Sequence, residues 1–171
     1  MKKQKIGYID AIFDEKTKKE IESWSMIVRD EDLYTISNEN KKDGGNITDK
    51  LHLTLFYGFD ENLLNMDEVL KFIDNIKLDI VKINGLGTFP VTGHNCKILF
   101  LKVDDDEDII KNIHEELKKF PYFSEYQKLK FIPHIAIAFI RNDLNTNALV
   151  YSNPSTLSVK KISYHSKFKE N

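Results

Sequence analysis

The same order of predicted elements occurs twice in the sequence, and this duplication limits the folds that are open to the chain. Each half contains a strand, a helix and a second strand, predicted at residues 5–13, 15–28 and 51–58 and again at 97–103, 107–120 and 131–140. The strands alternate apolar and polar side chains, whereas the helices repeat apolar residues every three or four positions. Further strands are predicted at residues 79–86 and 157–164, and a helix follows Asn65 as its N-cap. Helices combined with mostly antiparallel strands indicate the α+β class.

Chain length suits one domain built from two such halves. The sequence has 171 residues, which is a common size for a single domain. We expect two lobes related by pseudo-twofold symmetry, at about 1–90 and 91–171, with antiparallel sheets and flanking helices. The segment 85–93 contains glycine, proline and threonine and is predicted as a turn or as the crossing between the lobes.

A histidine occupies the same place in both halves. His52-Leu53-Thr54-Leu55 lies on the strand that closes the first half, and His134-Ile135-Ala136-Ile137 lies on the strand that closes the second. Because successive side chains on a strand point to opposite faces, His52 and Thr54 share one face, as do His134 and Ala136. If the halves pack symmetrically, both histidines face one groove.

Two imidazoles in one groove can supply general acid and general base catalysis near neutral pH. At a phosphate diester, one histidine would deprotonate the attacking hydroxyl or water and the other would protonate the leaving oxygen. The Thr54 hydroxyl is placed to donate to a phosphoryl oxygen. This scheme needs no metal or other cofactor, and the sequence has no dense cluster of His, Asp and Glu that would indicate a metal site.

Composition narrows the partners that we expect. The formal net charge of −2 gives no overall basic field for long nucleic acid, so a small nucleotide is the expected ligand. The apolar runs are far shorter than a membrane span, and the single cysteine, Cys96, cannot form an internal disulfide. We therefore predict a cytoplasmic protein without a membrane partner, in the host cytoplasm if the source is viral.

Two features around the groove are candidate substrate contacts. Tyr8 lies on the polar face of the first strand, and Phe56 shares the face of His52 by alternation, so either ring can stack on a base or belong to the core. The polar stretch 30–50 is predicted as a long loop that ends just before His52 and closes over the ligand.

The paired motifs HLTL and, after Phe131-Ile132-Pro133, HIAI resemble the two H-x-T/S-x motifs of the 2H phosphoesterase superfamily. The resemblance spans most of the chain and implies the two-lobed 2H phosphoesterase (LigT-like) fold, with His52, Thr54 and His134 as catalytic residues. Asp32-Leu33-Tyr34 followed by His-Leu-Thr-Leu-Phe-Tyr-Gly is similar to the phage anti-CBASS nucleases of that superfamily. That group implies metal-independent cleavage of cyclic di- or trinucleotides.

The sequence departs from the pattern at Ala136, where the superfamily has a second threonine or serine. Loss of one hydroxyl donor in the transition state costs on the order of 10²- to 10³-fold in rate. Two alternatives therefore stay open beside the cyclic nucleotide phosphodiesterase, namely a nucleotide-sequestering protein without turnover and an enzyme acting on RNA 2′,3′-cyclic or 2′-5′ linkages. The remaining histidines, His94, His114 and His165, are predicted to have surface or packing roles.

Overall fold

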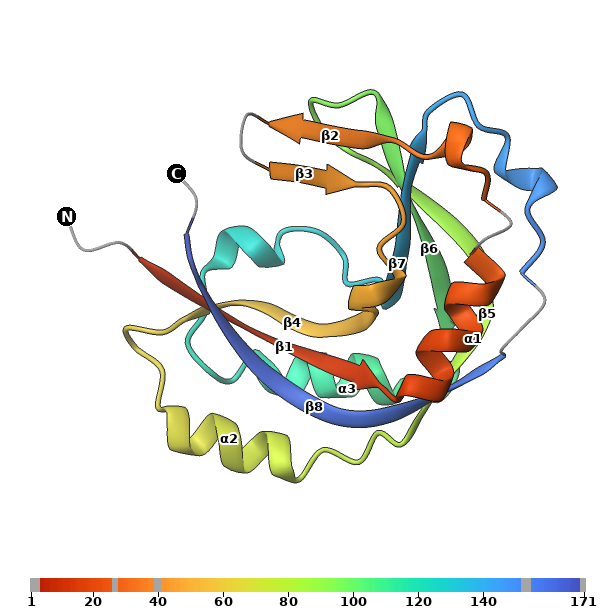
Figure 1. The fold of residues 1–171 in the computed structure, drawn as a ribbon. Coiled ribbons are helices and arrows are strands. Elements are labelled where there is room, and N and C mark those ends of the chain that lie inside the picture. The colour runs from red at the N-terminus through yellow and green to blue at the C-terminus, as the bar shows by residue number, and fades with distance from the viewer. Residues whose placement is uncertain (1–3, 26–27, 39–40, 152–154, 170–171) are drawn as a thin grey trace.

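The computed structural model describes residues 4–25, 28–38, 41–151 and 155–169. Within these ranges the chain forms eight strands and three α-helices (Figure 1). The strands are β1 Lys5–Phe13, β2 Thr35–Asn38, β3 Lys41–Gly44, β4 His52–Asp60, β5 Ile80–Pro90, β6 Cys96–Asp104, β7 His134–Arg141 and β8 Thr156–Phe168. The helices are α1 Glu15–Ser25, α2 Met66–Asp74 and α3 Ile109–Leu117, with short 3-10 turns between them.

Six of the strands form one antiparallel sheet in the order β4-β1-β8-β5-β6-β7. The long C-terminal strand β8 joins its two halves, because residues 159–168 pair with β1 and residues 156–158 pair with β5. This confirms the expected α+β class and a last strand that completes the sheet. It also places β8 beside β1, so a division of the chain near residue 90 does not separate the strands of the two halves.

The two edge strands of the sheet, β4 and β7, contact each other (Figure 1). The segment between β3 and β4 connects them: the Ile47 amide donates to the carbonyl of Ile137 in β7, and the 3-10 turn Thr48–Lys50 then leads into His52. A polar anchor holds this segment, since Asn46 bonds to both Ser25 and Thr48. Sheet curvature and this short connection bring the starts of β4 and β7 to the same side of the molecule.

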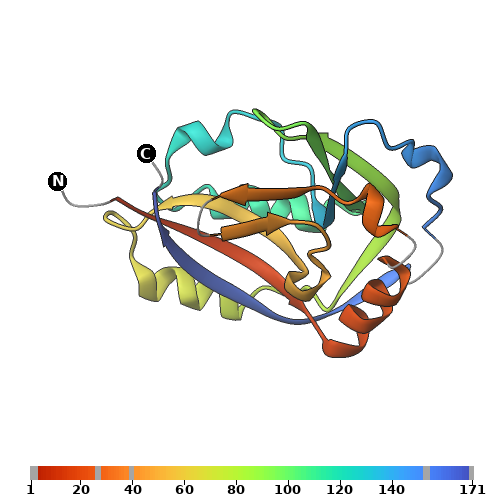
Figure 2. The ribbon, with the colours of Figure 1, turned by 45° about the horizontal axis from the view of Figure 1, so that its top comes forward.

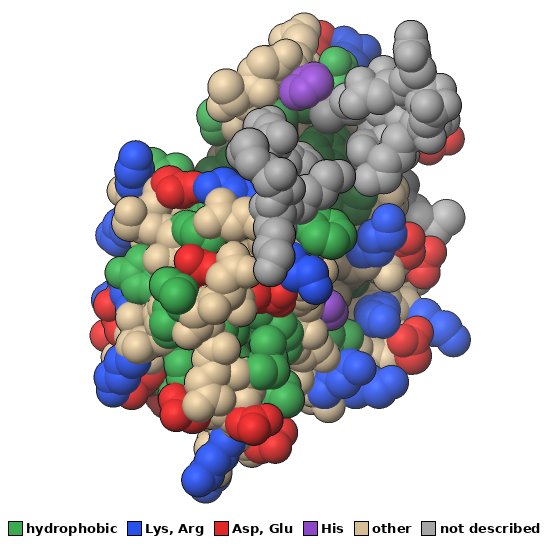
Figure 3. All heavy atoms as spheres, turned by 90° about the vertical axis from the view of Figure 1, so that its left-hand side faces the viewer, with side chains coloured by type: hydrophobic (Ala, Val, Ile, Leu, Met, Phe, Trp, Pro, Cys, Tyr) green, Lys and Arg blue, Asp and Glu red, His purple; other side chains and the backbone are tan. Residues whose placement is uncertain are grey.

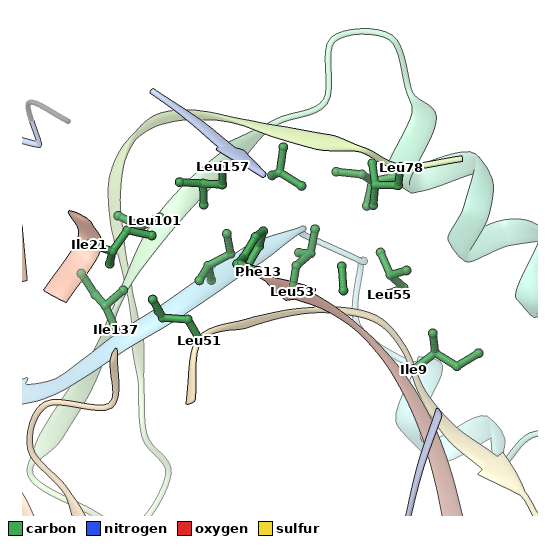
Figure 4. Close-up of a cluster of buried hydrophobic side chains, with 14 of the residues drawn as sticks. Ile9, Phe13, Ile21, Leu51, Leu53, Leu55, Leu78, Leu101, Ile137 and Leu157 are labelled. Carbon is green, nitrogen blue, oxygen red and sulfur yellow. The ribbon is translucent and has the colours of Figure 1, made fainter. Parts of the chain in front are cut away.

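Apolar side chains from both halves of the sheet meet in one core (Figure 4). Leu53 and Leu55 of β4 point into it, and Ile137 of β7 and Leu101 of β6 approach from the other half; all four are fully buried. Helix α1 adds Ile21 to the same cluster. The alternation that buries these residues leaves the intervening positions of β4 and β7 on the opposite face, where the histidines lie.

Most predicted elements are confirmed within a few residues, and their caps behave as expected. Asp14 caps α1, since its carboxylate accepts from the Thr17 amide at 2.7 Å. The acidic run before α3 is a capping device, because Asp105 accepts from the amides of Ile110 and Lys111. Helix α1 ends at Ser25, earlier than predicted, and residues 26–27 of its predicted last turn lie outside the described part of the chain.

Two predictions about loops are wrong. The stretch 30–50 contains the hairpin β2–β3, whose base pairs with β7 through Leu33 and Asn46. Figures 1 and 2 show this hairpin extending from β7 toward the end of the molecule that carries both termini. The segment 85–90 belongs to β5, so only residues 91–95 form the turn to β6. In both places hydrogen bonding to a neighbouring strand overrides the local preference of polar residues and glycine for turns.

The surface agrees with the small net charge. On the face in Figure 3, acidic and basic side chains are interspersed between apolar patches, with no continuous basic field. In the described part of the chain, no helix is long and apolar enough to cross a membrane.

Candidate active site

His52 and His134 have matching local geometry at the starts of β4 and β7. Nδ1 of His52 lies 2.7 Å from the carbonyl oxygen of Lys50, and Nδ1 of His134 lies 2.8 Å from that of Ile132. Each partner is the carbonyl two residues earlier. Because a carbonyl oxygen only accepts, Nδ1 carries the hydrogen in both rings, and Nε2 of each neutral ring keeps its lone pair. Both imidazoles are therefore held in the tautomer in which Nε2 can take up or release a proton.

The two imidazoles differ in burial, and burial affects the pKa of His134. Desolvation lowers the pKa of His134 from its ordinary value, the hydrogen bond to Ile132 opposes this, and the neighbouring His52 lowers it further. His52 itself is exposed. The lowered pKa favours a neutral His134 ring near neutral pH.

A β-bulge in β4 decides which residues share the face of His52. Asp10 of β1 pairs with Thr54, and the residue before it, Ile9, pairs with Phe56, so β4 contains one extra residue, Leu55. The bulge reverses the alternation beyond it. Phe56 is therefore buried in the core, only 1 % exposed, and its ring stacks on Phe59 with centroids 4.4 Å apart. The predicted site role of Phe56 is wrong, and Tyr57 takes its place on the face of Thr54.

Thr54 keeps the predicted face but has a partner that sequence reasoning missed. Its hydroxyl donates to Oδ1 of Asp10 at 2.8 Å, and Asp10 is 4 % exposed. The other carboxylate oxygen of Asp10 lies 3.7 Å from Nε2 of His165 on β8. Three neighbouring strands thus contribute one residue each to a polar row beside His52. The signal in the sequence was the polar Asp10 within an otherwise apolar strand.

These residues line an open hollow of about 530 Å³. It runs over β4, β1 and β8, and its lining includes the predicted residues His52, Thr54 and Tyr8. His134 is not part of this lining. The other residues that line it are Asp10, Ile12, Lys18, Asp49, Lys50, Leu51, Tyr57, His165 and Lys167. Burial and the nearby Asp10 raise the pKa of Tyr8, so this phenol stays neutral near physiological pH.

The half of the sheet around His134 is aromatic where the half around His52 is polar. Ala136 pairs with Phe100 of β6, in the position that Asp10 occupies opposite Thr54. The ring of Phe100 stacks on Phe89 of β5 with centroids 4.2 Å apart, and His134 packs edge-on against both rings. Gly87 makes this possible, because a Cβ there would lie 2.4 Å from the Phe100 ring. Ala136, which lacks the hydroxyl, therefore lies beside other apolar and aromatic side chains.

The remaining ionisable candidates divide between core and surface. His114 is 4 % exposed, stacks on Phe131 and donates from Nδ1 to the Leu55 carbonyl, so its packing role is confirmed. His94 is exposed in the turn between β5 and β6. His165 lines the hollow instead of having only a surface role. Among the residues that the structure describes, no group of three or more His, Cys, Asp or Glu side chains is arranged to hold a metal ion.

Solved structures with the same fold exist, although sequence comparison finds no match. No protein-family model and no curated protein matches the sequence. The fold matches E. coli LigT complexed with 3′-AMP, with a TM-score of 0.57 and 12 % identity over 99 % of this chain and 91 % of LigT. It matches apo LigT with a TM-score of 0.59 and 10 % identity over 98 % and 94 % of the chains. A structure described as a phosphoesterase matches with a TM-score of 0.51 and 13 % identity, over 95 % and 88 %.

The chain therefore has the LigT-like α+β fold expected from its paired histidine motifs. At these identities the similarity establishes the fold. LigT itself has also been crystallised with phosphate, ATP and NADP+.

Proposed function

We propose that the chain is a phosphodiesterase of the 2H type that acts on small nucleotides, with His134 as general base and His52 as general acid. The observation that carries the proposal is the shared geometry of the two imidazoles. Each begins an edge strand, each donates from Nδ1 to the carbonyl two residues earlier, and each keeps Nε2 for proton transfer. A purely structural pair of histidines has no need of this repeated arrangement. The LigT-like fold supports the same class of chemistry.

The roles follow from burial. The lowered pKa of His134 keeps its Nε2 unprotonated near neutral pH, so it can remove a proton from water or from a ribose hydroxyl. His52 then delivers a proton to the departing oxygen. The phosphorus centre would lie between them, because proton transfer needs each Nε2 within hydrogen-bond reach of its oxygen. The two imidazoles supply both proton transfers, so the proposed scheme calls for no metal ion.

Thr54 has to change its hydrogen bond to assist this reaction. Its hydroxyl has one hydrogen, which Asp10 accepts. When a phosphoryl oxygen competes for that hydrogen, the hydroxyl rotates toward the phosphate and Asp10 loses its donor. Thr54 can therefore donate to a phosphoryl oxygen, as the sequence predicted, only when its hydrogen bond to Asp10 is broken.

Within this class, we infer that the substrates are signalling nucleotides such as cyclic di- or trinucleotides. The HLTLFYG motif and the preceding Asp32-Leu33-Tyr34 resemble the anti-CBASS nucleases, and the near-neutral surface does not favour long nucleic acid. Tyr8, half-buried in the hollow, supports a site that stacks a base. LigT bound to 3′-AMP is a precedent for a small nucleotide on this fold.

Sequestration without turnover is a second candidate because of Ala136. Its cross-strand partner, Phe100, provides no hydroxyl in place of the missing one. With Thr54 engaged by Asp10, binding could persist while the transition state stays poorly stabilised.

A substrate panel separates these candidates. The protein is incubated in EDTA with cyclic di- and trinucleotides, 2′-5′ oligoadenylate and an RNA ending in a 2′,3′-cyclic phosphate, and the products are resolved by chromatography. Cleavage of cyclic nucleotides supports the proposal, whereas cleavage of the RNA end alone assigns RNA processing. Tight retention of an intact nucleotide, without products, assigns sequestration.

A further inference from the structure

The hollow beside His52 continues past Thr54 over a row of three rings. Tyr57 of β4, Tyr8 of β1 and His165 of β8 form this row. Tyr8 stacks on His165 with centroids 5.0 Å apart and is tilted against Tyr57 with centroids 5.6 Å apart. The strand registers explain the row, because Tyr8 pairs with Tyr57 on one side and with His165 on the other. All three rings are half-buried and line the hollow.

The positive charges of the hollow lie at its two ends. Lys50, two residues before His52, and Lys18 of α1 line the end near His52. Lys167 lies at the other end, two residues beyond His165 and therefore about 7 Å farther along β8. Its Nζ is 5.1 Å from the centroid of the Tyr57 ring, a cation–π arrangement that holds the charge beside the ring row.

The order along the hollow is thus His52, Thr54, the ring row and Lys167. A dinucleotide has the same alternation of groups, because a sugar that carries its base separates one phosphate from the next. Aromatic faces stack bases with little preference among them, at about 1–3 kcal/mol per base. A lysine ammonium attracts a phosphate as a point charge. The hollow therefore has room and chemistry for a unit beyond the reacting phosphate.

We propose that Tyr57, Tyr8, His165 and Lys167 form a second subsite, which binds the nucleoside and the next phosphate of the substrate. This rests on the proposed function, which places the reacting phosphate between His52 and His134. The subsite assigns the substrate to nucleotides with at least two phosphates joined through a nucleoside, whether linear or cyclic. A mononucleotide supplies a nucleoside for the ring row but leaves Lys167 without a phosphate.

The test compares two substrates that share one reacting group. Adenosine 2′,3′-cyclic phosphate and the dinucleotide ApA 2′,3′-cyclic phosphate differ by one nucleotide unit, so the ratio of their kcat/KM values measures the subsite. We expect the unaltered protein to prefer the dinucleotide at least tenfold, and Lys167→Ala to remove most of that preference. Lys160→Ala is the matched control, because Lys160 is exposed on the same strand and does not line the hollow.

Tyr8→Leu tests the ring row separately, since leucine keeps apolar volume but offers no ring face. We expect it to lower kcat/KM by fivefold or more for both substrates, because both carry a nucleoside next to the reacting phosphate, with thermal unfolding showing that the variant is folded. Equal kcat/KM for the two substrates in the unaltered protein, or a preference that survives Lys167→Ala, overturns the subsite.

Binding keeps the inference testable if the proposed function fails. If neither substrate is cleaved, calorimetric titration with AMP and with pApA replaces the rate comparison. The subsite predicts tighter binding of pApA and a selective loss of that advantage in Lys167→Ala. Cleavage without dinucleotide preference contradicts only the subsite. Preferential pApA binding, when no nucleotide of the substrate panel is cleaved, contradicts only the proposed function.

Discussion

The Thr54 hydroxyl donates a hydrogen bond to Oδ1 of Asp10 across the β4–β1 pair, over 2.8 Å. Asp10 is almost fully buried, and its second oxygen lies 3.7 Å from Nε2 of His165. No described residue gives that Nε2 atom a hydrogen bond. A buried carboxylate beside a proposed phosphate site repels the phosphate and competes for the hydrogen that the phosphate needs. Under the proposed function, we expect Asp10 to act as a positioning residue that controls how Thr54 meets the substrate.

Two replacements of Asp10 should separate its negative charge, which repels the phosphate, from its hydrogen bond with Thr54. In Asp10→Asn the charge is lost, and the amide can donate to the Thr54 oxygen, which frees the hydroxyl hydrogen for the phosphate. We expect a KM several-fold lower with kcat within threefold of the original. In Asp10→Ala the hydroxyl loses its partner, and we expect kcat to fall about tenfold. Steady-state kinetics on the substrate found by the panel measures both, and identical behaviour of the two variants would rule out this role.

Restoration of the hydroxyl at Ala136 should increase turnover. Ala136 is half-buried on the face of His134, so a threonine there can direct its oxygen toward the phosphoryl group. One added transition-state donor is worth up to about 10²-fold in kcat. Ala136→Val is the matched control, because valine has the shape of threonine without the hydroxyl. If the threonine variant is no faster than the valine variant, Ala136 does not limit the rate.

A side chain at Gly58 should lower the free energy of unfolding. Gly58 has φ 105°, and a Cβ there would lie 2.7 Å from the Tyr126 ring, whose segment bonds to the edge of β4. Gly93 also has a positive φ, 81°, but among the described residues nothing lies within 4 Å of its Cβ position. We expect Gly93→Ala to cost about 1 kcal/mol and Gly58→Ala at least about 2 kcal/mol more. Urea denaturation measures both, and equal losses would show that the Tyr126 contact is unimportant.

Stability should decrease as the pH falls below 6.5. Burial lowers the pKa of His114, while its hydrogen bond to the Leu55 carbonyl opposes the shift, and burial lowers the pKa of His134 as well. Between the lowered folded value and the ordinary value of 6.5, the unfolded chain binds more protons than the folded one. The folded state is therefore fully favoured above pH 6.5 and loses stability as the pH falls through the folded pKa values.

His114→Gln tests this dependence, because glutamine keeps an N–H donor and does not titrate. The His114 contribution can reach about 1.4 kcal/mol for each pH unit within that window. We expect urea denaturation between pH 5 and 7 to show a shallower pH dependence in this variant than in His94→Gln, whose histidine is exposed. An unchanged slope would mean that His114 is protonated without cost in the folded protein.

The bulge in β4 explains why the sequence predicted only part of the site. Strand alternation correctly placed His52 and Thr54 on one face, because both precede the bulge at Leu55. It failed at Phe56, since an inserted residue reverses the faces and no local sequence signal marks the insertion. His165 was missed for a different reason: it joins the site only through pairing of β8 with β1, more than 150 residues away along the chain. Such long-range pairing is not encoded in any short motif.

The fold was predictable where local patterns and tertiary contacts agree. The caps at Asp14 and Asn65 and the apolar alternation of β1 and β4 were sufficient to predict their elements. The hairpin β2–β3 was not, because its sequence is polar and its base is held by hydrogen bonds to β7. Those bonds come from Tyr34, Gly45 and Ile47, which pair with the far half of the chain.

The most direct test of the account is the pH dependence of kcat/KM for the unaltered protein, His52→Ala and His134→Ala, measured in EDTA on the substrate that the panel identifies. We predict a bell-shaped profile for the unaltered protein and a rate loss of about 10²- to 10⁴-fold in each variant. The His134 variant should lose the limb in which activity falls at low pH, because that limb reports protonation of the base. The His52 variant should lose the limb at high pH, which reports loss of the acid. Full activity in either variant, or a profile that keeps both limbs in both, would contradict paired acid and base catalysis by the two histidines.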